Sequence, residues 1–242
     1  PRPELGDVQE LTHLNRIVRW CSDGVERIEL EPDPRHVEIL VKQAGLKMDS
    51  KGVTAPGVRA PATDDGLPPP SDLLDDESKS LYRSMVMRGA YLAQDRADIQ
   101  FACKELARRM SAPTQDDWGA LKRLVRYLVY RPRVVVCFDR QARQDTIDGY
   151  SDADWAGCPH SRKSTSSSYL MVGSHLLASS STTQTVIATS SGESEFYAAV
   201  KTASRVLGGA AMAKDLALVL DPRAMIDASA AKGIASRRGV GK

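Results

Sequence analysis

Three acidic residues in the second half of this 242-residue chain occupy settings from which their carboxylates could share metal ions. Asp152 ends an apolar segment, Glu195 falls in the first turn of an expected helix, and Asp227 ends a short expected strand. A central strand, a neighbouring helix terminus and an adjacent parallel strand can bring three carboxylates to one point. Hydrolysis of a phosphodiester by two divalent ions needs such a cluster, because the ions bind both the attacking water and the leaving oxygen. Mg²⁺ suits hard oxygen ligands and keeps coordination sites for water and phosphate.

Spacing alone leaves a second interpretation of these acids open. Acidic residues are common at strand ends and at helix N-termini, and Glu193 and Glu195 would meet the helix dipole favourably whatever their function. From spacing alone, the three acids form either a metal site or a set of surface acids and helix caps.

The elements expected to carry these acids begin after Pro132, where the apolar pattern changes from helical to strand-like. Alternating and β-branched residues predict strands, whereas a longer amphipathic period predicts helices. The expected strands are residues 134–138, a strand leading into 149–152, a hairpin of 169–172 and 175–178, a weaker strand at 185–189, and 224–227. The expected helices run from 193 to about 220, with Gly208 and Gly209 weakening the middle and Pro222 ending it, and from 229 to 236.

The first half has a helical pattern interrupted by one long irregular stretch. Helices are expected at 33–45, with Asp33 as N-cap, at 81–94, at 97–110, and after Pro113, where Thr114 and Asp117 come close to a capping box. Residues 47–80 are rich in proline and acids, with Pro68–Pro70 in the middle, and we expect a long loop or a linker there.

Basic residues cluster between Lys104 and Arg133, although the formal net charge of the whole chain is only +2. Total charge therefore says little about a nucleic-acid partner. On the helix expected after Pro113, Lys122, Arg123 and Arg126 could bind phosphates, since such contacts come mostly from Lys and Arg. A solvated helix face explains the same pattern. Arg162 and Lys163, in an expected loop between strands, could likewise contact nucleic acid.

Other composition features exclude several classes of protein. The four cysteines are scattered without metal-ligand spacing, which indicates reduced thiols of a cytosolic protein. No apolar run is long enough to span a membrane, so no membrane partner is expected. Trp118 and Trp155 are expected to anchor the core.

Four segments of the second half are typical of one family. They read Gly-Tyr-Ser-Asp-Ala-Asp-Trp-Ala-Gly at 149–157, Arg-Lys-Ser-Thr-Ser at 162–166, Ser-Ser-Gly-Glu-Ser-Glu-Phe-Tyr-Ala at 190–198 and Asp-Ala-Ser-Ala-Ala at 227–231. In this order they resemble the RNase H domain of copia-type LTR retrotransposons. Upstream, residues 91–99 and 118–128 are similar to the helices that join reverse transcriptase to RNase H in these elements.

The resemblance implies a segment of a Pol polyprotein in two parts. Residues 1–135 would be the C-terminal, α-rich thumb and connection of a reverse transcriptase. Residues 136–242 would be an α/β RNase H-like domain, a mixed sheet with flanking helices, incomplete at its C-terminus. The resemblance also implies that Asp152, Glu195 and Asp227 are the catalytic, metal-binding acids and that they work with two Mg²⁺ or Mn²⁺ ions.

The implied reaction is endonucleolytic cleavage of RNA in an RNA–DNA hybrid, which would be recognised by its shape and by the 2′-OH. Expected partners are this nucleic acid and the rest of the Pol polyprotein, in the cytoplasm or within virus-like particles.

Two departures from the family keep an alternative function open. The polymerase word Tyr-x-Asp-Asp is absent, and the fourth acidic metal ligand of the family, on a final helix, is expected to be missing. The alternative is a catalytically inactive retroelement remnant that only binds nucleic acid. An RNase H-like transposase or resolvase would share the carboxylates but not the upstream segments.

Overall fold

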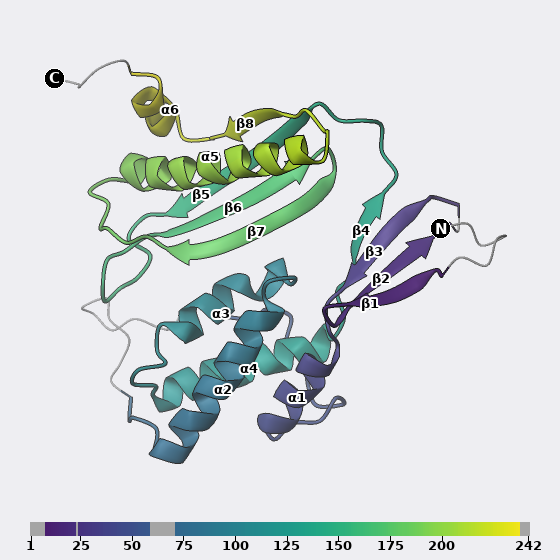
Figure 1. Ribbon diagram of the computed structural model, residues 1–242. Helices are drawn as coiled ribbons and strands as arrows, with labels where there is room; N and C mark the ends of the chain where they lie inside the picture. The colour runs from purple at the N-terminus through teal and green to yellow at the C-terminus, as the bar shows by residue number, and fades with distance from the viewer. Residues whose placement is uncertain (1–7, 23, 59–70, 238–242) are drawn as a thin grey trace. The chain divides into compact units, whose positions relative to one another are not determined.

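The computed structural model describes residues 8–22, 24–58 and 71–237. The chain divides into two compact units, Pro1–Arg140 and Gln141–Lys242, called units 1 and 2 below. Each unit combines helices with one four-stranded sheet (Figure 1). The expected mixed α/β class is therefore confirmed. No helix in the described parts of the chain has both the length and the apolar character needed to cross a membrane.

The sheet of unit 1 is antiparallel throughout, in the order β1-β2-β3-β4. Its strands are β1 (Glu10–His13), β2 (Arg16–Cys21), β3 (Arg27–Glu31) and β4 (Val136–Asp139). The expected strand at 134–138 is confirmed as β4, which joins this sheet by pairing with β3. No strand was expected among the first 33 residues, so the α-rich description of this half omits a sheet.

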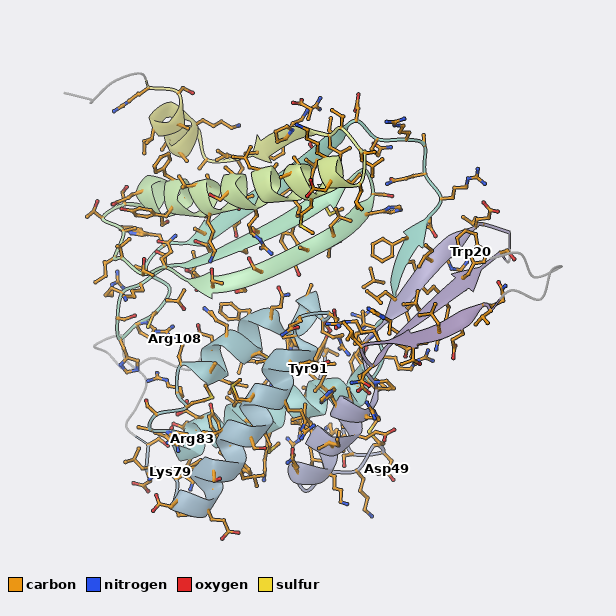
Figure 2. All side chains as sticks on the ribbon, viewed as in Figure 1. Trp20, Asp49, Lys79, Arg83, Tyr91 and Arg108 are labelled. Atoms are coloured by element: carbon orange, nitrogen blue, oxygen red, sulfur yellow. The ribbon has the colours of Figure 1, made fainter. Side chains whose placement is uncertain are left out.

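Alternation divides the sheet of unit 1 into a charged face and an apolar face. On the charged face, Arg19 of β2 lies between Glu10 of β1 and Glu29 of β3 in the strand register. On the opposite face, Trp20 of β2, labelled in Figure 2, lies opposite Ile28 of β3 in the strand register. This period of two residues is typical of a half-buried sheet.

The helices of unit 1 enclose its apolar core, which is built from α1, α2, α3 and α4 and the residues next to them. Their bounds are α1 (Arg35–Gln43), α2 (Asp76–Leu92), a short 3₁₀ turn η2 (Ala97–Ile99), α3 (Gln100–Ala107) and α4 (Gln115–Tyr130). The capping box of α4 is confirmed, since Thr114 accepts from the backbone of Asp117 and Asp117 accepts from the backbone of Thr114. The expected N-cap of α1 was one residue too early: Pro34 is the N-cap, and Asp33 accepts from the backbone N–H of Arg35.

The irregular stretch expected at 47–80 is shorter in the structure. Helix α2 begins at Asp76, because the side chain of Asp75 accepts from the backbone N–H of Ser78 and caps the helix. Residues 47–58 contain no helix or strand, and Val53 donates its N–H to the carbonyl of Arg126 on α4. Pro68–Pro70 lie outside the described residues.

The sheet of unit 2 has the order β7-β6-β5-β8, with β5, β6 and β7 antiparallel and β8 parallel to β5. Its elements are β5 (Thr146–Asp154), β6 (Thr165–Val172), β7 (His175–Thr183), α5 (Ser191–Asp215), β8 (Asp221–Met225) and α6 (Ser229–Ala235). The expected hairpin is confirmed as β6 and β7, with Gly173 at φ +58° in the turn. Helix α5 lies along the sheet (Figure 1) and packs closely, since a Cβ on Gly149 would lie 2.2 Å from Val206 Cγ2.

Three expectations for unit 2 were wrong in detail. Residues 185–189 are not a strand: β7 ends at Thr183, and the chain turns to the N-cap of α5 at Ser190. Helix α5 ends at Asp215 rather than near residue 220, and Pro222 lies in β8 instead of ending the helix. The helix does pass through Gly208 and Gly209, and the backbone at Gly209 packs against Ile147 and Leu170. The strand after the helix is 221–225 rather than 224–227; it is an edge strand, which tolerates the proline within it.

Candidate functional site

Glu195 joins the first turn of α5 to the end of β5. Ser190 caps the helix by accepting from the N–H of Glu193 at 3.1 Å, and this starts the turn that carries Glu195. The Glu195 Oε1 atom accepts a hydrogen bond from the backbone N–H of Ala153 at 3.1 Å. Ala153 lies between Asp152 and Asp154 on β5, so this bond holds the Glu195 carboxylate beside the acidic end of the strand.

The second carboxylate oxygen of Glu195 has a different environment. Its Oε2 atom is buried and has no hydrogen-bond partner among the described residues. A buried carboxylate oxygen without a donor is costly, because desolvation is not offset. Such an oxygen is a ready ligand for a hard cation.

The electrostatics of Glu195 link all three predicted acids. Burial raises the pKa of Glu195, and the N–H of Ala153 opposes that rise. The negative charges of Asp152 and Asp227 raise the pKa further. Like charges at short range disfavour ionisation in this way, and a bound cation would reverse the effect.

The other two acids lie at the margins of the sheet. Asp152 is exposed on β5, while Asp227 is exposed two residues beyond the end of β8. Within the described ranges, no three or more His, Cys, Asp or Glu side chains form a group that could hold a metal ion. The structure thus brings Asp152 and Asp227 into the electrostatic range of Glu195 but does not gather them into a ligand set. The donor chemistry and the unpartnered oxygen fit Mg²⁺ or Mn²⁺.

The loop after β5 presents the basic pair of unit 2. The N–H of Arg162 donates to the carbonyl of Cys158 at 2.9 Å, and the N–H of Cys158 donates to the carbonyl of Lys163 at 3.2 Å. Arg162 is exposed and has φ +55°, a left-handed conformation that non-glycine residues seldom adopt. The loop is therefore held by its own backbone, and it directs Arg162 to the surface.

Helix α4 of unit 1 carries the other basic group. Arg126 is exposed, and the Lys122 ammonium lies 5.8 Å from the centre of the Trp118 ring. Arg123 differs, because its Nε atom is buried without a partner among the described residues. Lys122 and Arg126 therefore fit phosphate contacts better than Arg123 does.

Comparison with known proteins places this chain among retroelement proteins. No protein-family model matches the sequence. The chain is 36% identical over 125 residues to the retrovirus-related Pol polyprotein from transposon RE2 of Arabidopsis thaliana, a match of 52% of this chain and 8% of that protein. It is 37% identical over 103 residues to the secreted RxLR effector protein 161 of Plasmopara viticola, of which it covers 72%. The chain belongs to the retrovirus-related Pol proteins of copia-type retrotransposons.

The match to this Pol family is local. A third relative, the uncharacterized mitochondrial protein AtMg00810 of Arabidopsis thaliana, is 27% identical over 175 residues, which is 71% of this chain and 68% of that protein. The chain spans about 8% of the length of the transposon RE2 and RE1 polyproteins that it matches.

Two contacts near the acids of this Pol chain had no signal in the sequence. Trp155, expected in the core, is 52% exposed, and its Nε1–H donates to the carbonyl of Ala188 at 3.1 Å. Gln184 is buried, and its amide nitrogen donates to Ser166 and to the backbone of Ser194. Neither residue belongs to a periodic pattern, and both partners are distant in sequence, so only the folded chain reveals these contacts.

Proposed function

We propose that unit 2 is an RNase H-like domain that cleaves the RNA strand of RNA–DNA hybrids in a metal-dependent reaction. The strand order supports this proposal: three antiparallel strands are followed by a helix and then by a strand parallel to the first. Such an arrangement brings residues on β5, α5 and the segment after β8 to one end of the sheet. The predicted acids come from these three elements.

The environment of Glu195 carries the proposal. One of its oxygens is fixed by the N–H of Ala153, the other is buried without a partner among the described residues, and the charges of Asp152 and Asp227 act on it. A helix-capping acid would keep both oxygens in water or on backbone donors. A partly buried acid that repels two others is typical of a functional site.

Asp152, Glu195 and Asp227 would hold the Mg²⁺ or Mn²⁺ ions. When bound, a pair of such ions supplies an activated water and stabilises the leaving oxygen of a phosphodiester. The chain itself contributes orientation. The N–H of Ala153 holds one carboxylate oxygen of Glu195, and burial of the other keeps water away from it.

The basic residues would bind the sugar–phosphate backbone of the hybrid. In unit 2, Arg162 on its ordered loop is the first candidate, with Lys163 beside it. In unit 1, Lys122, Arg123 and Arg126 on α4 would add contacts, with Arg123 contributing least. Contacts of this kind give affinity without sequence preference and weaken as salt rises.

A second candidate function is binding of nucleic acid without cleavage. One observation favours it: within the described ranges, the three acids do not form a group that could hold a metal ion. The same basic residues would then bind nucleic acid in a protein whose three carboxylates do not form a metal site.

Cleavage of a labelled RNA–DNA hybrid in Mg²⁺ distinguishes the two candidates. Asp152→Asn should reduce cleavage to background and leave hybrid binding intact. Asp154→Asn is the matched control, because Asp154 accepts from the N–H of Thr165, and an asparagine oxygen can accept the same bond. Hybrid binding without cleavage by the unaltered chain would refute the nuclease proposal and support the binding function. Equal loss in both variants would show that the loop, rather than the charge of Asp152, matters.

A further inference from the structure

The buried side chain of Gln184 connects the sheet of unit 2 to the first turn of α5. Gln184 directly follows β7 and is 8% exposed. Its Nε2 atom donates to Ser166 Oγ on β6 at 2.9 Å and to the carbonyl oxygen of Ser194 at 2.8 Å. Its backbone N–H donates to the carbonyl of Ser164, directly before β6, at 2.8 Å, which holds the backbone of Gln184 at the start of that strand. Ser194 immediately precedes Glu195 on the helix.

The orientation of this amide follows from its partners. The backbone oxygen of Ser194 can only accept, so the NH₂ group of Gln184 must point at it. The opposite atom, Oε1, is then buried, and it has no hydrogen-bond partner among the described residues. Burying an amide with one atom unsatisfied costs stability, and an apolar side chain would avoid that cost. Stability alone therefore does not explain a glutamine at this position.

A second polar contact holds the same helix farther along. Arg205 of α5 donates through one nitrogen to Ser168 Oγ at 2.6 Å and to Ser180 Oγ at 2.5 Å. It ties the middle of α5 to β6 and β7, as Gln184 ties its beginning to β6. Arg205 lies ten residues beyond Glu195 on α5, about 15 Å along the helix axis. Gln184 thus holds the first turn of α5, whereas Arg205 holds the middle of the helix. Substituting each residue in turn distinguishes the effects of these two attachments.

We propose that Gln184 is a positioning residue for Glu195: its amide fixes the first turn of α5 on β6, and thereby fixes the distance between the Glu195 carboxylate and Asp152 on the neighbouring strand. The metal-related part of this inference rests on the proposed function, whereas the structural part does not. Groups that orient a metal-binding residue typically change metal affinity or activity by about 10- to 100-fold when removed.

The test compares Gln184→Met with Arg205→Met in the full chain. Methionine approximates the shape of glutamine and removes both donated hydrogen bonds. Mn²⁺ affinity is measured by electron paramagnetic resonance, and hybrid cleavage is measured against Mg²⁺ concentration. Gln184→Met should weaken Mn²⁺ binding about 10-fold or more and raise the Mg²⁺ concentration for half-maximal cleavage by a similar factor. Arg205→Met should leave both quantities within about 2-fold. Equal effects in the two variants would overturn the proposal.

Amide hydrogen exchange separates failure of this inference from failure of the proposed function. If the unaltered chain neither binds Mn²⁺ nor cleaves hybrid, the proposed function fails, but exchange at residues 193–196 still reports the position of the turn. Faster exchange there in Gln184→Met than in Arg205→Met supports the positioning role, and equal exchange overturns it. Should Gln184→Met not fold, Gln184→Asn serves in its place, because it keeps an amide that is too short to reach Ser194.

Discussion

The ion cluster around Glu31 should make unit 1 sensitive to acid. Glu31 ends β3 and is only 3% exposed. It accepts from Arg133 Nε at 2.5 Å and from a terminal nitrogen of Arg19 at 2.6 Å. The hydrogen bonds from Arg133 outweigh burial and, together with Arg19, lower the pKa of Glu31 from 4.5 to about 2. Since Arg133 follows α4, the cluster also joins the exit of that helix to the sheet.

The magnitude follows from the difference between the folded and unfolded pKa values. A pKa held at about 2, against 4.5 in the unfolded chain, corresponds to about 3 kcal/mol of stability. Because the Arg133 side chain is 61% exposed and partly screened by water, we expect about 2 to 3 kcal/mol. A lowered carboxyl pKa stabilises the fold above pH 4.5, and that stability is lost as the pH falls through about 2. At pH 3, less than about half of it should persist.

Urea unfolding followed by tryptophan fluorescence measures this effect in the unaltered chain and in Glu31→Gln. At pH 7 the variant should be less stable by about 2 to 3 kcal/mol, and the difference should shrink to less than half by pH 3. Glu29→Gln is the control, because Glu29 lies on the same strand and bonds Arg27 rather than Arg133. A difference that stays constant between pH 7 and pH 3 would refute the electrostatic explanation and indicate a packing defect instead.

Three further substitutions test the packing. Tyr82→Phe should cost about 1 kcal/mol, because the buried hydroxyl donates to the carbonyl of Leu106 at 2.9 Å; an unchanged urea midpoint would contradict this. Gly149→Ala should destabilise unit 2 by about 2 kcal/mol, since the new Cβ would lie 2.2 Å from Val206 Cγ2, and a neutral thermal unfolding result would show that α5 can move away. Gly208 lies on α5, and a Cβ added there would have no atom within 4 Å. Gly208→Ala should therefore stabilise unit 2 by up to about 1 kcal/mol. A lower unfolding temperature of this variant would count against an uninterrupted α5.

Local signals predicted the helices and the hairpin of this chain well. The capping box at Thr114 depends on residues three apart, and the turn at Gly173 depends on one residue that readily adopts positive φ. Both signals are complete within a few positions. The helix after Gly192 was also expected, although its end was placed five residues too late, because the exposed apolar residues beyond Asp215 continue the pattern without continuing the helix.

The sheet of unit 1 had no comparable local signal. Its strands β1, β2 and β3 are short and carry many charges, such as Arg19, whose ion pairs with Glu10 and Glu31 form only across the sheet. The turn between β1 and β2 uses Leu14 and Asn15, both at positive φ, in place of the glycine that usually marks such a hairpin. Strand β4 is distant in sequence from its partner β3. Non-local pairing therefore decided a structure that propensity could not predict.

The candidate site likewise has features that the sequence predicted and features that depend on non-local packing. The motif resemblance identified Asp152, Glu195 and Asp227, and each is exposed or half-buried near one end of the sheet of unit 2. What the sequence could not predict is the hydrogen bond from Ala153 or the buried, unpartnered oxygen of Glu195. Both depend on how α5 sits on β5, which is a property of tertiary packing.

The packing of α5 on the sheet of unit 2 includes polar contacts. Ser166 and Ser168 of β6 are buried, as is Ser164 directly before the strand. Arg205 of α5 donates to Ser168, and Gln184 links Ser166 to the backbone of Ser194 on the helix. Apolar layers tolerate small sliding movements, because dispersion contacts have little direction. Hydrogen bonds of 2.5 to 3.0 Å between named atoms do not tolerate such movements. A helix held by directional bonds keeps its first turn in one position on the sheet. A carboxylate site that depends on the separation between α5 and β5 needs this fixed position. Ser166, Ser168 and Ser180 thus help to hold, through Gln184 and Arg205, the helix that carries Glu195.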